Sequence, residues 1–343
     1  MLTTPLLPED YLAYWNPLWA LREPRGRVDA VVPETAESAT LWIRTPPGWP
    51  AHRPGQYVRV GVEVDGVRHW RTYSLTSLAG RRDGHMAITV KVMSGGLVST
   101  QLVRRTPPGT IVRLAPPAGD YTLPDPLPER LLFVTAGSGV TPVMAMLRDL
   151  VARAALPDTV LVHLAPSRDD VIFGAELRGL GGRLPALRLH EHHDDVHGRF
   201  DVAGLDRLVP DLLEREVWAC GPEGLLDALG ALFAAAGIPD RLHVERFRPV
   251  VAAPGVTGGG GRVTFAASGK VVDVDGSTPL LVAGEQAGAL LPSGCRMGIC
   301  HTCVGRLRSG ALRDVRTGEI HDTPGELVQT CVCAPVGPVE IGL

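Results

Sequence analysis

The sequence lacks several features that mark whole classes of protein. It has no run of 18 or more apolar residues, so we expect no membrane-spanning helix. Its first ten residues carry no basic cluster and no long apolar core, so we expect no signal peptide. With 34 basic and 37 acidic residues the net charge is −3, and the sequence therefore offers no electrostatic case for binding nucleic acid.

Cysteine is scarce until the C-terminal end of the chain. Only six cysteines occur, and five of them fall in the last 49 residues. Cysteines gathered in one place indicate metal binding, whereas a disulfide framework would distribute them along the chain. We therefore expect a reducing compartment, the cytoplasm, with any contact to a membrane made through a partner protein.

The spacing of these cysteines narrows the choice of metal. Cys295, Cys300 and Cys303 form a C-x₄-C-x₂-C triplet, and Cys331 follows after a long gap. This is the ligand pattern of a plant-type [2Fe–2S] cluster. Structural zinc sites instead recruit two C-x₂₋₄-C pairs or Cys/His pairs, so we favour iron–sulfur over zinc.

The residues around the cysteines resemble plant-type ferredoxins. The run Ser293–Cys303 is similar to the ferredoxin cluster loop, and Gln329–Val332 is similar to the strand that carries the fourth ligand. The spacing alone accepts either Cys331 or Cys333 as that ligand. The resemblance implies that Cys333 is a spare buried thiol. It implies four cluster ligands, Cys295, Cys300, Cys303 and Cys331.

Two regions before the cysteine cluster differ in their rhythm of apolar residues. At 343 residues, with 45% hydrophobic and 21% charged residues, the chain can form two or three globular domains. Short β runs separated by Pro and Gly, between about residues 26 and 128, predict a β-barrel. From about residue 129 the pattern becomes strand 131–135, helix 140–155 and strand 160–165, which predicts a parallel α/β sheet.

A third region begins after a glycine-rich segment. Val251–Gly261 is small and polar, and its composition predicts a flexible linker that lets the C-terminal module move. After it, residues 262–265 and 270–274 predict a hairpin, and 278–291 predict a helix. This is the β-grasp order of a ferredoxin.

The β-rich region contains two segments that resemble a flavin site. Arg71–Thr76 reads Arg-Thr-Tyr-Ser-Leu-Thr and resembles the R-x-Y-S signature of the ferredoxin–NADP reductase superfamily. A guanidinium suits a flavin phosphate, a tyrosine ring stacks on the flavin, and a serine hydroxyl can hydrogen-bond it. About twenty residues on, glycines precede a helix start, where backbone N–H groups favour a diphosphate. The resemblance implies FAD, bound by Arg71, Tyr73, Ser74, Leu75, Thr76, Gly95, Gly96, Leu97, Val98 and Ser99.

The α/β region contains two turns that resemble the nucleotide site of the same superfamily. Thr135–Pro142 follows the first strand and has two glycines that let the backbone approach a pyrophosphate, while its proline suits a first helical turn. A later strand ends in Cys-Gly-Pro, which looks like the turn beside the nicotinamide. The resemblance implies NAD(P)H binding by Gly137, Ser138, Gly139, Thr141, Pro142, Cys220, Gly221 and Pro222.

The end of the α/β region adds an acid and an aromatic ring. The run His243–Phe247 resembles the E-x-F ending of related reductases, whose acid and ring lie near the flavin. Hydride transfer needs no strong general acid or base, so we expect no catalytic dyad. The residues implied at the reaction centre are Tyr73, Ser74, Cys220, Glu245 and Phe247.

The residues after the second α/β strand bear on the choice of nucleotide. Ser167 and Arg168 can hold the 2′-phosphate of NADPH, whereas an acidic residue prefers the ribose hydroxyl of NADH. Asp169 and Asp170 follow directly. We favour NADPH, bound through Ser167 and Arg168, and leave NADH open.

Two further patterns receive structural interpretations. The run His190–Arg199 contains four histidines, and because histidine-rich surface loops are common we interpret it as a surface loop and not as a metal site. An aromatic stripe near the N-terminus has helical spacing, and we expect it to pack on the barrel in preference to docking on a partner or a membrane. The stripe consists of Tyr11, Tyr14, Trp15, Leu18 and Trp19.

Together these resemblances imply an electron-transfer reductase. NAD(P)H would deliver a hydride to FAD, and the cluster would export electrons singly. The expected fold is multidomain α/β and β: an FAD-binding β-barrel with an N-terminal extension (1–128), a parallel NAD(P)-binding α/β domain (129–249), a linker (250–261) and a β-grasp ferredoxin domain (262–343).

The electron acceptor is the least defined part of this interpretation. Similar chains serve terminal oxygenases, di-iron hydroxylases and membrane fatty acyl desaturases, and Asn16–Trp19 looks most like reductases paired with acyl-CoA desaturases. The alternatives are an FMN-type dioxygenase reductase and a flavin/iron–sulfur redox sensor. We expect a monomer.

Overall fold

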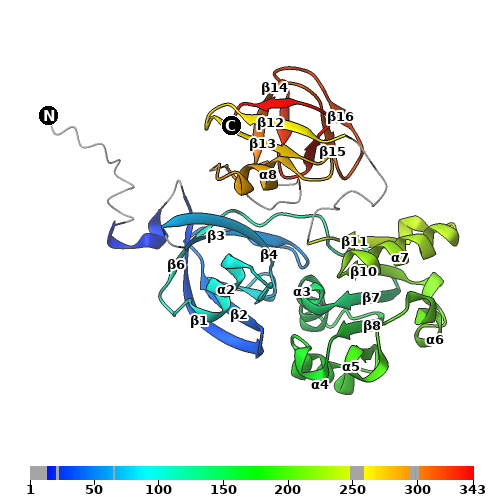
Figure 1. Ribbon diagram of the computed structural model, residues 1–343. Coiled ribbons are helices and arrows are strands. Elements are labelled where there is room, and N and C mark those ends of the chain that lie inside the picture. Colours follow the sequence, from blue (N-terminus) through cyan, green and yellow to red (C-terminus); the bar gives the residue numbers. More distant parts are fainter. Residues whose placement is uncertain are drawn as a thin grey trace. The chain divides into compact units, whose positions relative to one another are not determined.

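The computed structural model describes residues 14–20, 23–64, 66–247, 259–289, 291–293, 298 and 301–343. The chain divides into two compact units, Met1–Arg246 and Phe247–Leu343, and each is considered by itself (Figure 1). No helix in the described ranges combines the length and apolar character needed to cross a membrane.

The first part of the N-terminal unit is a six-stranded antiparallel barrel. Its strands run in the order β4-β3-β6-β1-β2-β5, and a bridge between Leu75 and Ile88 joins the end of β4 to β5. This bridge closes the sheet, so the predicted barrel is confirmed. The strands are β1 (Arg25–Thr35), β2 (Ser38–Arg44), β3 (Tyr57–Val64), β4 (Val67–Ser74), β5 (His85–Lys91) and β6 (Ile111–Leu114).

The barrel forms because its strands are rich in β-branched residues that fill one core. Val58, Val60 and Ile88 are fully buried, and the helix α2 (Leu97–Arg104) adds Val98 and Leu102 to the same cluster. Burying such side chains stabilises the fold by about 1.5–3 kcal/mol each. The core therefore holds the ends of β4 and β5, where the predicted flavin residues lie.

The second part of the N-terminal unit is a parallel five-stranded sheet. The strand order is β11-β10-β7-β8-β9, so the chain proceeds outward from β7 in one direction and then returns to the other side of β7 with β10. This reversal creates a switch point between β7 and β10, where ligands of open α/β sheets bind. The strands are β7 (Arg130–Ala136), β8 (Asp158–Ala165), β9 (Leu187–His193), β10 (Glu216–Cys220) and β11 (Leu242–Glu245).

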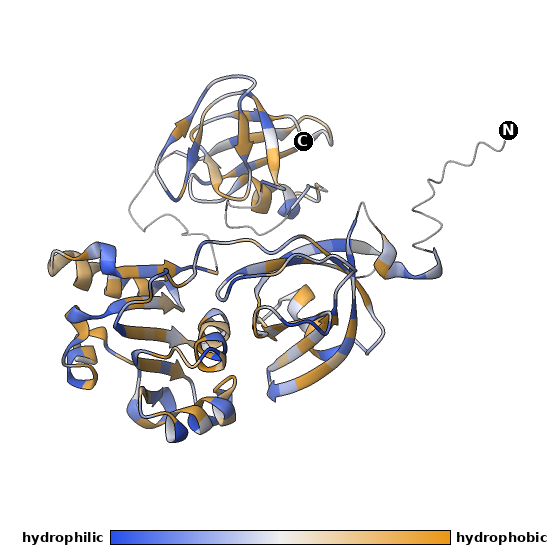
Figure 2. Cartoon of the chain, turned by 180° about the vertical axis from the view of Figure 1, so that it is seen from behind, coloured by the Kyte–Doolittle hydropathy of each residue, from blue (hydrophilic) through white to orange (hydrophobic). Residues whose placement is uncertain are grey.

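Helices cover both faces of this sheet. The central strands are apolar along their length (Figure 2), as expected for strands buried on both sides. One face packs against α3 (Val140–Ala152) and α4 (Gly174–Arg183), and the other against α6 (Leu205–Leu208) and α7 (Glu223–Ala235). The shorter elements are η1 (Pro17–Trp19), η2 (Gly137–Gly139), η3 (Arg168–Asp170), α5 (Asp194–His197), η4 (Val202–Gly204), η5 (Leu212–Glu214) and η6 (Pro239–Arg241).

The C-terminal unit is a β-grasp domain. A five-stranded sheet has the order β13-β12-β19-β14-β17, and a small sheet has the order β16-β15-β18. The predicted hairpin is confirmed, because β12 and β13 pair antiparallel. The elements are β12 (Gly261–Phe265), β13 (Lys270–Val274), α8 (Leu280–Gln286), β14 (Val304–Ser309), β15 (Leu312–Asp314), β16 (Ile320–His321), β17 (Leu327–Gln329), β18 (Cys333–Pro335) and β19 (Val339–Ile341).

Two details of this unit differ from the sequence prediction. The helix expected over 278–291 is only α8, because Gly288 takes a left-handed φ of 74° just after it. Gly261, assigned above to the linker, is the first residue of β12, where a Cβ would lie 2.1 Å from the carbonyl oxygen of Gly337. Most of the predicted linker, 250–258, lies outside the described residues.

The aromatic stripe does not pack on the barrel as expected. Leu18 is buried, but Tyr14 and Trp15 are 91% and 87% exposed. The expectation was therefore wrong for these two rings. A stripe packs as a unit only on a continuous helix. The chain here turns through Asn16 into the short η1 helix, and the Asn16 side chain accepts a hydrogen bond from the Leu18 N–H. Tyr11 lies outside the described residues.

Candidate flavin, nucleotide and iron–sulfur sites

The end of β4 presents the first predicted flavin residues. Ser74 is only 5% exposed, and its hydroxyl has no hydrogen-bond partner in the described part of the chain. Tyr73 packs on the barrel core, and burial raises the pKa of its hydroxyl, so the phenol stays neutral. Arg71 donates from Nη1 to the carbonyl oxygen of Trp70 at 2.8 Å. This strand end therefore combines a cation, a ring and an unsatisfied hydroxyl.

Leu75 and Thr76 are engaged within the protein. Leu75 is fully buried and forms the bridge that closes the barrel. The Thr76 hydroxyl lies 3.1 Å from that of Thr89, and its carbonyl accepts a hydrogen bond from Arg148 of α3. These two residues thus hold the barrel closed and tie it to the α/β domain, and their side chains offer no group to a ligand.

The turn before α2 leaves backbone N–H groups at a helix start. Gly95 has a φ of 68°, and a Cβ on Gly96 would lie 2.9 Å from the carbonyl oxygen of Met93. The Ser99 hydroxyl accepts from the Met93 N–H and donates to the Gly96 carbonyl, both at 3.1 Å. Ser99 therefore holds the turn in shape. Leu97 is half-exposed and Val98 is buried in the barrel core.

Two predicted nucleotide turns meet at the switch point. Gly137 has a φ of 52° and begins η2, and Thr141 donates from its hydroxyl to the Ser138 carbonyl at 2.9 Å. A Cβ on Gly139 would lie 2.0 Å from the carbonyl oxygen of Cys220, so only glycine permits this approach. Pro142 lies in the first turn of α3. Gly221 and Pro222 lie between β10 and α7.

A buried polar group lies beside these turns. Cys220 and Glu245 are register partners at the ends of β10 and β11. Burial raises the pKa of Glu245 to about 8 and raises that of Cys220 well above its ordinary value. One carboxylate oxygen of Glu245 has no hydrogen-bond partner among the described residues. Burial therefore favours the neutral form of both groups.

Tyr121 joins this group, and the sequence analysis missed it. Burial raises the pKa of its hydroxyl, and the nearby Cys220 and Glu245 raise it further. The hydroxyl has no hydrogen-bond partner in the described ranges. Tyr121 follows the barrel directly, and a Cβ on Gly55 would lie 2.0 Å from its carbonyl oxygen. An aromatic residue at the junction of two domains is the signal that could have found it.

The same strand register continues across the sheet. Cys220 is the partner of Thr135, which is the partner of His163, which is the partner of Glu191. The His163 Nδ1 lies 2.8 Å from the Thr135 hydroxyl, and burial lowers the pKa of His163 to about 3. A row of polar side chains therefore crosses the carboxyl edge of the sheet on the α3 face.

Lys91 is a second residue that the sequence analysis missed. It ends β5, and its Nζ lies 3.9 Å from the position of a Cβ on Gly137. A barrel residue thus brings a cation to the glycine turn of the α/β domain. The sequence feature that could have identified Lys91 is its position, four residues before Gly95 in the β run that leads to the second flavin segment.

The predicted 2′-phosphate residues lie in and before η3. The Arg168 side chain is exposed and forms no ion pair with any described residue. The Ser167 hydroxyl donates to the Asp170 carboxylate at 2.7 Å. Asp170 is thus engaged with Ser167, while the Arg168 side chain is exposed after the end of β8. Phe247 follows β11 and is 39% exposed.

The C-terminal unit brings two of the predicted cluster ligands together. Cys303 and Cys331 are buried, and Thr330 donates from its backbone N–H and its hydroxyl to the Cys303 carbonyl, at 3.1 and 2.7 Å. These two bonds hold the turn of Cys331 against Cys303. Cys295 and Cys300 lie outside the described residues.

Cys333 has different neighbours. It begins β18 opposite Asp314 of β15, and burial raises the pKa of its thiol to about 12. Asp314, His321 and Cys333 place potential metal-binding atoms within 4.8 Å of one another. However, Asp314 is paired with Arg316, and His321 Nδ1 lies 2.7 Å from Glu326. Protein groups therefore already satisfy two members of this cluster.

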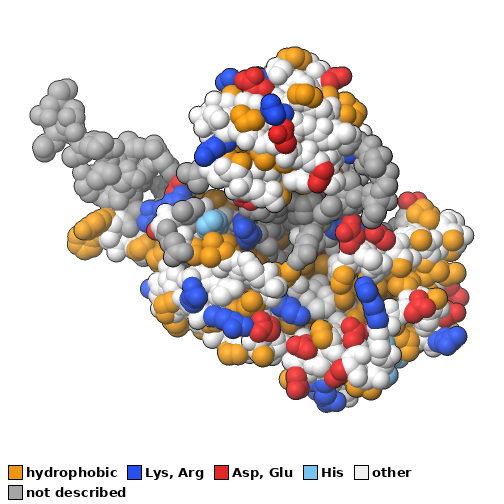
Figure 3. Space-filling model, viewed as in Figure 1, with side chains coloured by type: hydrophobic (Ala, Val, Ile, Leu, Met, Phe, Trp, Pro, Cys, Tyr) orange, Lys and Arg blue, Asp and Glu red, His pale blue; other side chains and the backbone are white. Residues whose placement is uncertain are grey.

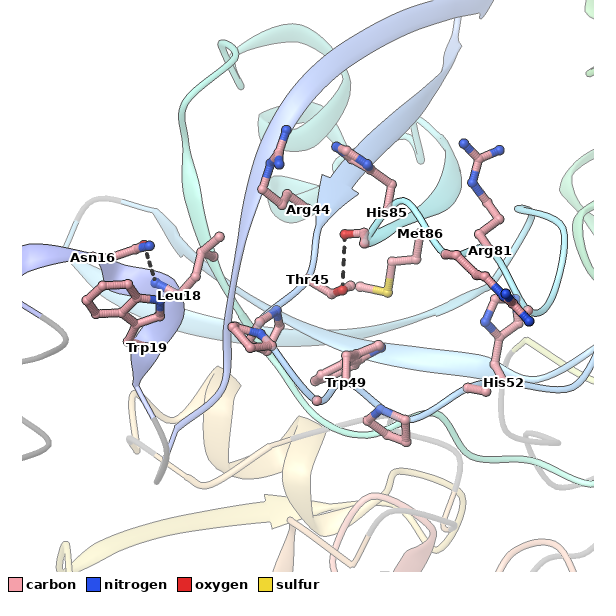
Figure 4. Close-up of a pocket in the computed structure, with 18 residues that line it drawn as sticks. Asn16, Leu18, Trp19, Arg44, Thr45, Trp49, His52, Arg81, His85 and Met86 are labelled. Atoms are coloured by element: carbon pink, nitrogen blue, oxygen red, sulfur yellow. Dashed lines mark hydrogen bonds between the residues drawn. The ribbon is translucent and has the colours of Figure 1, made fainter.

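A pocket of about 430 Å³ lies elsewhere on the barrel (Figure 4). Leu18 and Trp19 of the N-terminal extension, Trp49 of the β2–β3 loop and Arg81 of the β4–β5 loop line it. None of the predicted flavin or nucleotide residues belongs to its lining. On the face shown in Figure 3, acidic and basic side chains are interspersed over each unit, in line with the small net charge.

Comparison with known families identifies all three parts of the chain. Residues 45–123 match the Oxidoreductase FAD-binding domain, residues 133–230 the Oxidoreductase NAD-binding domain, and residues 263–336 the 2Fe-2S iron-sulfur cluster binding domain. The chain is thus an NAD(P)H-dependent oxidoreductase with FAD and a [2Fe–2S] cluster.

Relatives match nearly the whole length of this chain. An NADPH oxidoreductase of Mycobacterium tuberculosis is 52% identical, over 98% of this chain and 88% of its own. The stachydrine N-demethylase reductase subunit of Rhizobium meliloti is 29% identical, over 94% and 97%. Phthalate dioxygenase reductase shares the fold with a TM-score of 0.67 and 22% identity, over 94% of this chain and 98% of its own. The chain belongs to the ferredoxin–NADP reductase superfamily, among the members that carry a C-terminal plant-type [2Fe–2S] ferredoxin domain.

Proposed function

We propose that this protein is the reductase component of an oxygenase system and that NADPH is its electron donor. The names of its relatives support an oxygenase as the acceptor, since a 30%-identical relative is named as the reductase subunit of a glycine betaine monooxygenase. Terminal oxygenases, di-iron hydroxylases and membrane fatty acyl desaturases remain the classes of acceptor to test. One NADPH supplies two electrons and a proton as hydride, so each turnover delivers two single electrons and releases one proton.

The strand end and the helix start on the barrel would hold the flavin. FAD, when bound, accepts two electrons as a hydride and releases them one at a time. Arg71 would bind a phosphate, the Tyr73 ring would pack on the flavin, and the unsatisfied Ser74 hydroxyl would donate to it. The backbone N–H groups in the first turn of α2, which begins at Leu97, favour a diphosphate, which FAD has and FMN lacks.

The switch point would hold the nicotinamide half of the nucleotide. The glycine turn of η2 approaches Cys220 so closely that a pyrophosphate can reach both backbones. Cys220 is buried and Glu245 is half-buried, and the raised pKa of each favours its neutral form, so little negative charge opposes the approach of hydride.

NADPH is the proposed donor because Arg168 offers a guanidinium without an ionic partner in the described chain. A 2′-phosphate would complete that pairing, with the Ser167 hydroxyl beside it. Of the two acids that argue for NADH, Asp169 and Asp170, the second already accepts from Ser167. The 52%-identical relative is named for NADPH, which supports the same choice.

The ferredoxin unit would accept electrons at a cluster bound by Cys295, Cys300, Cys303 and Cys331. Thr330 supports Cys331 as the fourth ligand because its two hydrogen bonds hold that turn on Cys303. Cys333 would stay a buried thiol opposite Asp314.

The observation that carries this proposal is the meeting of the η2 turn, Cys220 and Glu245 at one switch point, within the unit whose barrel carries Ser74. The test is anaerobic mixing of the purified holoprotein with NADPH, followed by absorbance for the flavin and by electron paramagnetic resonance for the cluster. Flavin bleaching followed by a reduced [2Fe–2S] signal is expected. A flavin that NADPH reduces without any electron reaching the cluster would contradict the proposed route.

A further inference from the structure

The turn that carries Cys331 is held from both of its sides. On the N-terminal side, Thr330 is bonded to the Cys303 carbonyl, as described above. On the C-terminal side, the carbonyl of Val332 accepts a hydrogen bond from the N–H of Val315 at 2.8 Å. Val315 begins the turn after β15. The hydrogen bond therefore joins the turn after β15 to Val332, the residue that follows Cys331.

The next residue of that turn, Arg316, has its side chain fixed by Asp314. Its backbone N–H and its Nε donate to Asp314 Oδ1 at 2.8 and 3.0 Å, and its Nη2 donates to Oδ2 at 2.6 Å. Asp314 is only 5% exposed. A carboxylate bound on both oxygens leaves the planar guanidinium a single orientation.

In that orientation the guanidinium reaches the segment between Cys295 and Cys300. Arg316 Nη1 donates to the carbonyl oxygen of Gly298 at 3.1 Å. A Cβ on Gly298 would lie 2.2 Å from the same nitrogen, and the φ of Gly298 is 73°. The guanidinium therefore fills the space that a side chain at this position would need.

We infer that Arg316 is a positioning residue for the [2Fe–2S] cluster: its guanidinium, oriented by Asp314, ties the Gly298 carbonyl of the cluster loop to the turn that carries Cys331. The inference rests on the proposed ligands Cys295, Cys300, Cys303 and Cys331. Three ligands come from one loop and the fourth from a distant turn, so the site needs a link between the two segments, and Arg316 spans them.

The same side chain puts a positive charge beside the ligands. The Nη1 of the guanidinium lies 3.1 Å from the carbonyl oxygen of Gly298, which stands between the proposed ligands Cys295 and Cys300 in the sequence. Reduction adds one negative charge to the cluster, and nearby net charge is one of the factors that set its reduction potential. Arg316 should therefore favour the reduced state as well as keep the loop in place.

The test compares Arg316→Gln with wild type in the full-length holoprotein. Two quantities are measured: the rate at which a chelator bleaches the cluster, and the cluster midpoint potential. We expect at least tenfold faster bleaching and a more negative potential, by up to 59 mV if the reduced-to-oxidised ratio falls tenfold. Arg262→Gln is the matched control, because Arg262 pairs with Asp273 on the surface of the same unit.

Two further variants test which property of Arg316 matters. They distinguish the positioning of the loop by Arg316 from the effect of its positive charge and from its neutralisation of Asp314. Arg316→Lys keeps the charge but cannot bind both Asp314 oxygens and Gly298, so its potential should return toward wild type while bleaching stays fast. Asp314→Asn combined with Arg316→Gln removes the buried unpaired carboxylate. If this double variant retains the cluster as wild type does, Arg316 only neutralises Asp314 and the inference is overturned.

The outcomes also distinguish this inference from the proposed function. A wild-type protein without a [2Fe–2S] spectrum would refute the proposed ligands themselves. A wild type with that spectrum and an Arg316→Gln variant with unchanged bleaching and potential would refute only the role of Arg316. If Arg316→Gln assembles no cluster, Arg316→Lys decides: fast bleaching supports the inference and wild-type bleaching overturns it.

Discussion

Single residues at the switch point owe their chemistry to burial. Glu245 is an ordinary glutamate in the sequence, yet in the structure its carboxyl lies among Cys220, Tyr121 and the end of β10 without a cationic partner in the described residues. Burial disfavours the charged form and raises its pKa to about 8. The charge state of this site is therefore a property of the fold.

Glu245→Gln should change how stability depends on pH. Between the unfolded pKa near 4.5 and the folded pKa near 8, folded Glu245 keeps a proton that the unfolded chain has lost, so wild-type stability falls as pH rises through this window. Glutamine has no proton to lose. From pH 5 to pH 8.5 we expect the variant to gain on the order of 2–4 kcal/mol relative to wild type. Parallel melting curves for both proteins across this range would contradict the prediction, and exposed Glu223→Gln is the control.

Arg168→Ala should discriminate between the two nucleotides. Loss of a charge-assisted hydrogen bond to the 2′-phosphate costs about 1.5–3 kcal/mol, so KM for NADPH should rise roughly tenfold to a hundredfold. KM for NADH should stay almost unchanged, since NADH has no such phosphate. The measurement is steady-state dye reduction with each nucleotide, and Arg183→Ala, an exposed arginine of α4, is the control. Equal effects on both nucleotides would favour the aspartates as the determinants.

Cys331 and Cys333 should respond oppositely to the same substitution. Cys331→Ser removes the proposed fourth ligand and should abolish the visible [2Fe–2S] spectrum. Cys333→Ser exchanges a buried thiol for a hydroxyl of similar size and should keep it. The two absorbance spectra, recorded with iron content, decide the assignment, and a reversed result would move the fourth ligand to β18.

At the scale of elements, the turn before α2 depends on having no side chain at Gly96. The Ser99 hydroxyl bridges the turn, and the carbonyl of Met93 lies where a Cβ would go. Ser99, which the sequence analysis placed on the ligand, thus contributes by shaping the backbone that is offered to a diphosphate.

Gly96→Ala should weaken FAD binding without unfolding the α/β domain. The Cβ would push against Met93 and displace the N–H groups at the start of α2, so the purified variant should contain less FAD and lose it faster on dilution. Gly179→Ala in α4 is the matched control, because a Cβ there meets nothing within 4 Å and alanine favours a helix by about 1 kcal/mol. The flavin released from wild type should be FAD, and chromatography showing FMN would contradict the diphosphate argument.

At the scale of the whole molecule, the two units separate chemistry from export. The predicted flavin and nucleotide turns lie in Met1–Arg246, together with the contacts that join them, such as Arg148 with Thr76. The two described residues of the predicted ligand set, Cys303 and Cys331, lie in Phe247–Leu343, which has a hydrophobic core of its own. Hydride transfer to FAD should therefore not require the ferredoxin unit.

A protein truncated after residue 250 should fold and keep the first of the two reactions, the reduction of the flavin by NADPH. We expect NADPH oxidation with ferricyanide, which takes electrons directly from the flavin, at a rate within about twofold of the full chain. Delivery to a protein acceptor should be lost, because the cluster is gone. If ferricyanide reduction also fails while FAD content is normal, the units are interdependent and this division is wrong.

The sequence by itself determined the class of protein, because the spacing and order of motifs along the chain carry that information. Three cysteines within nine residues and a fourth far downstream indicate one kind of cluster, and R-x-Y-S, the glycine turns and Cys-Gly-Pro lie in one order along the chain. The barrel, the parallel sheet and the β-grasp hairpin also follow local patterns of apolar residues. Such features depend on neighbours in sequence and can be predicted without contacts.

The tertiary structure alone decided which of these residues are available to a ligand. Thr76 and Ser99 read as ligand-binding residues, but their hydroxyls are bonded within the protein, whereas the Ser74 hydroxyl is not. Tyr121 at the switch point and Arg316 at Gly298 act on residues that are distant in sequence. Burial, hydrogen-bond satisfaction and pKa depend on segments that folding brings together, so no spacing along the chain could have revealed them.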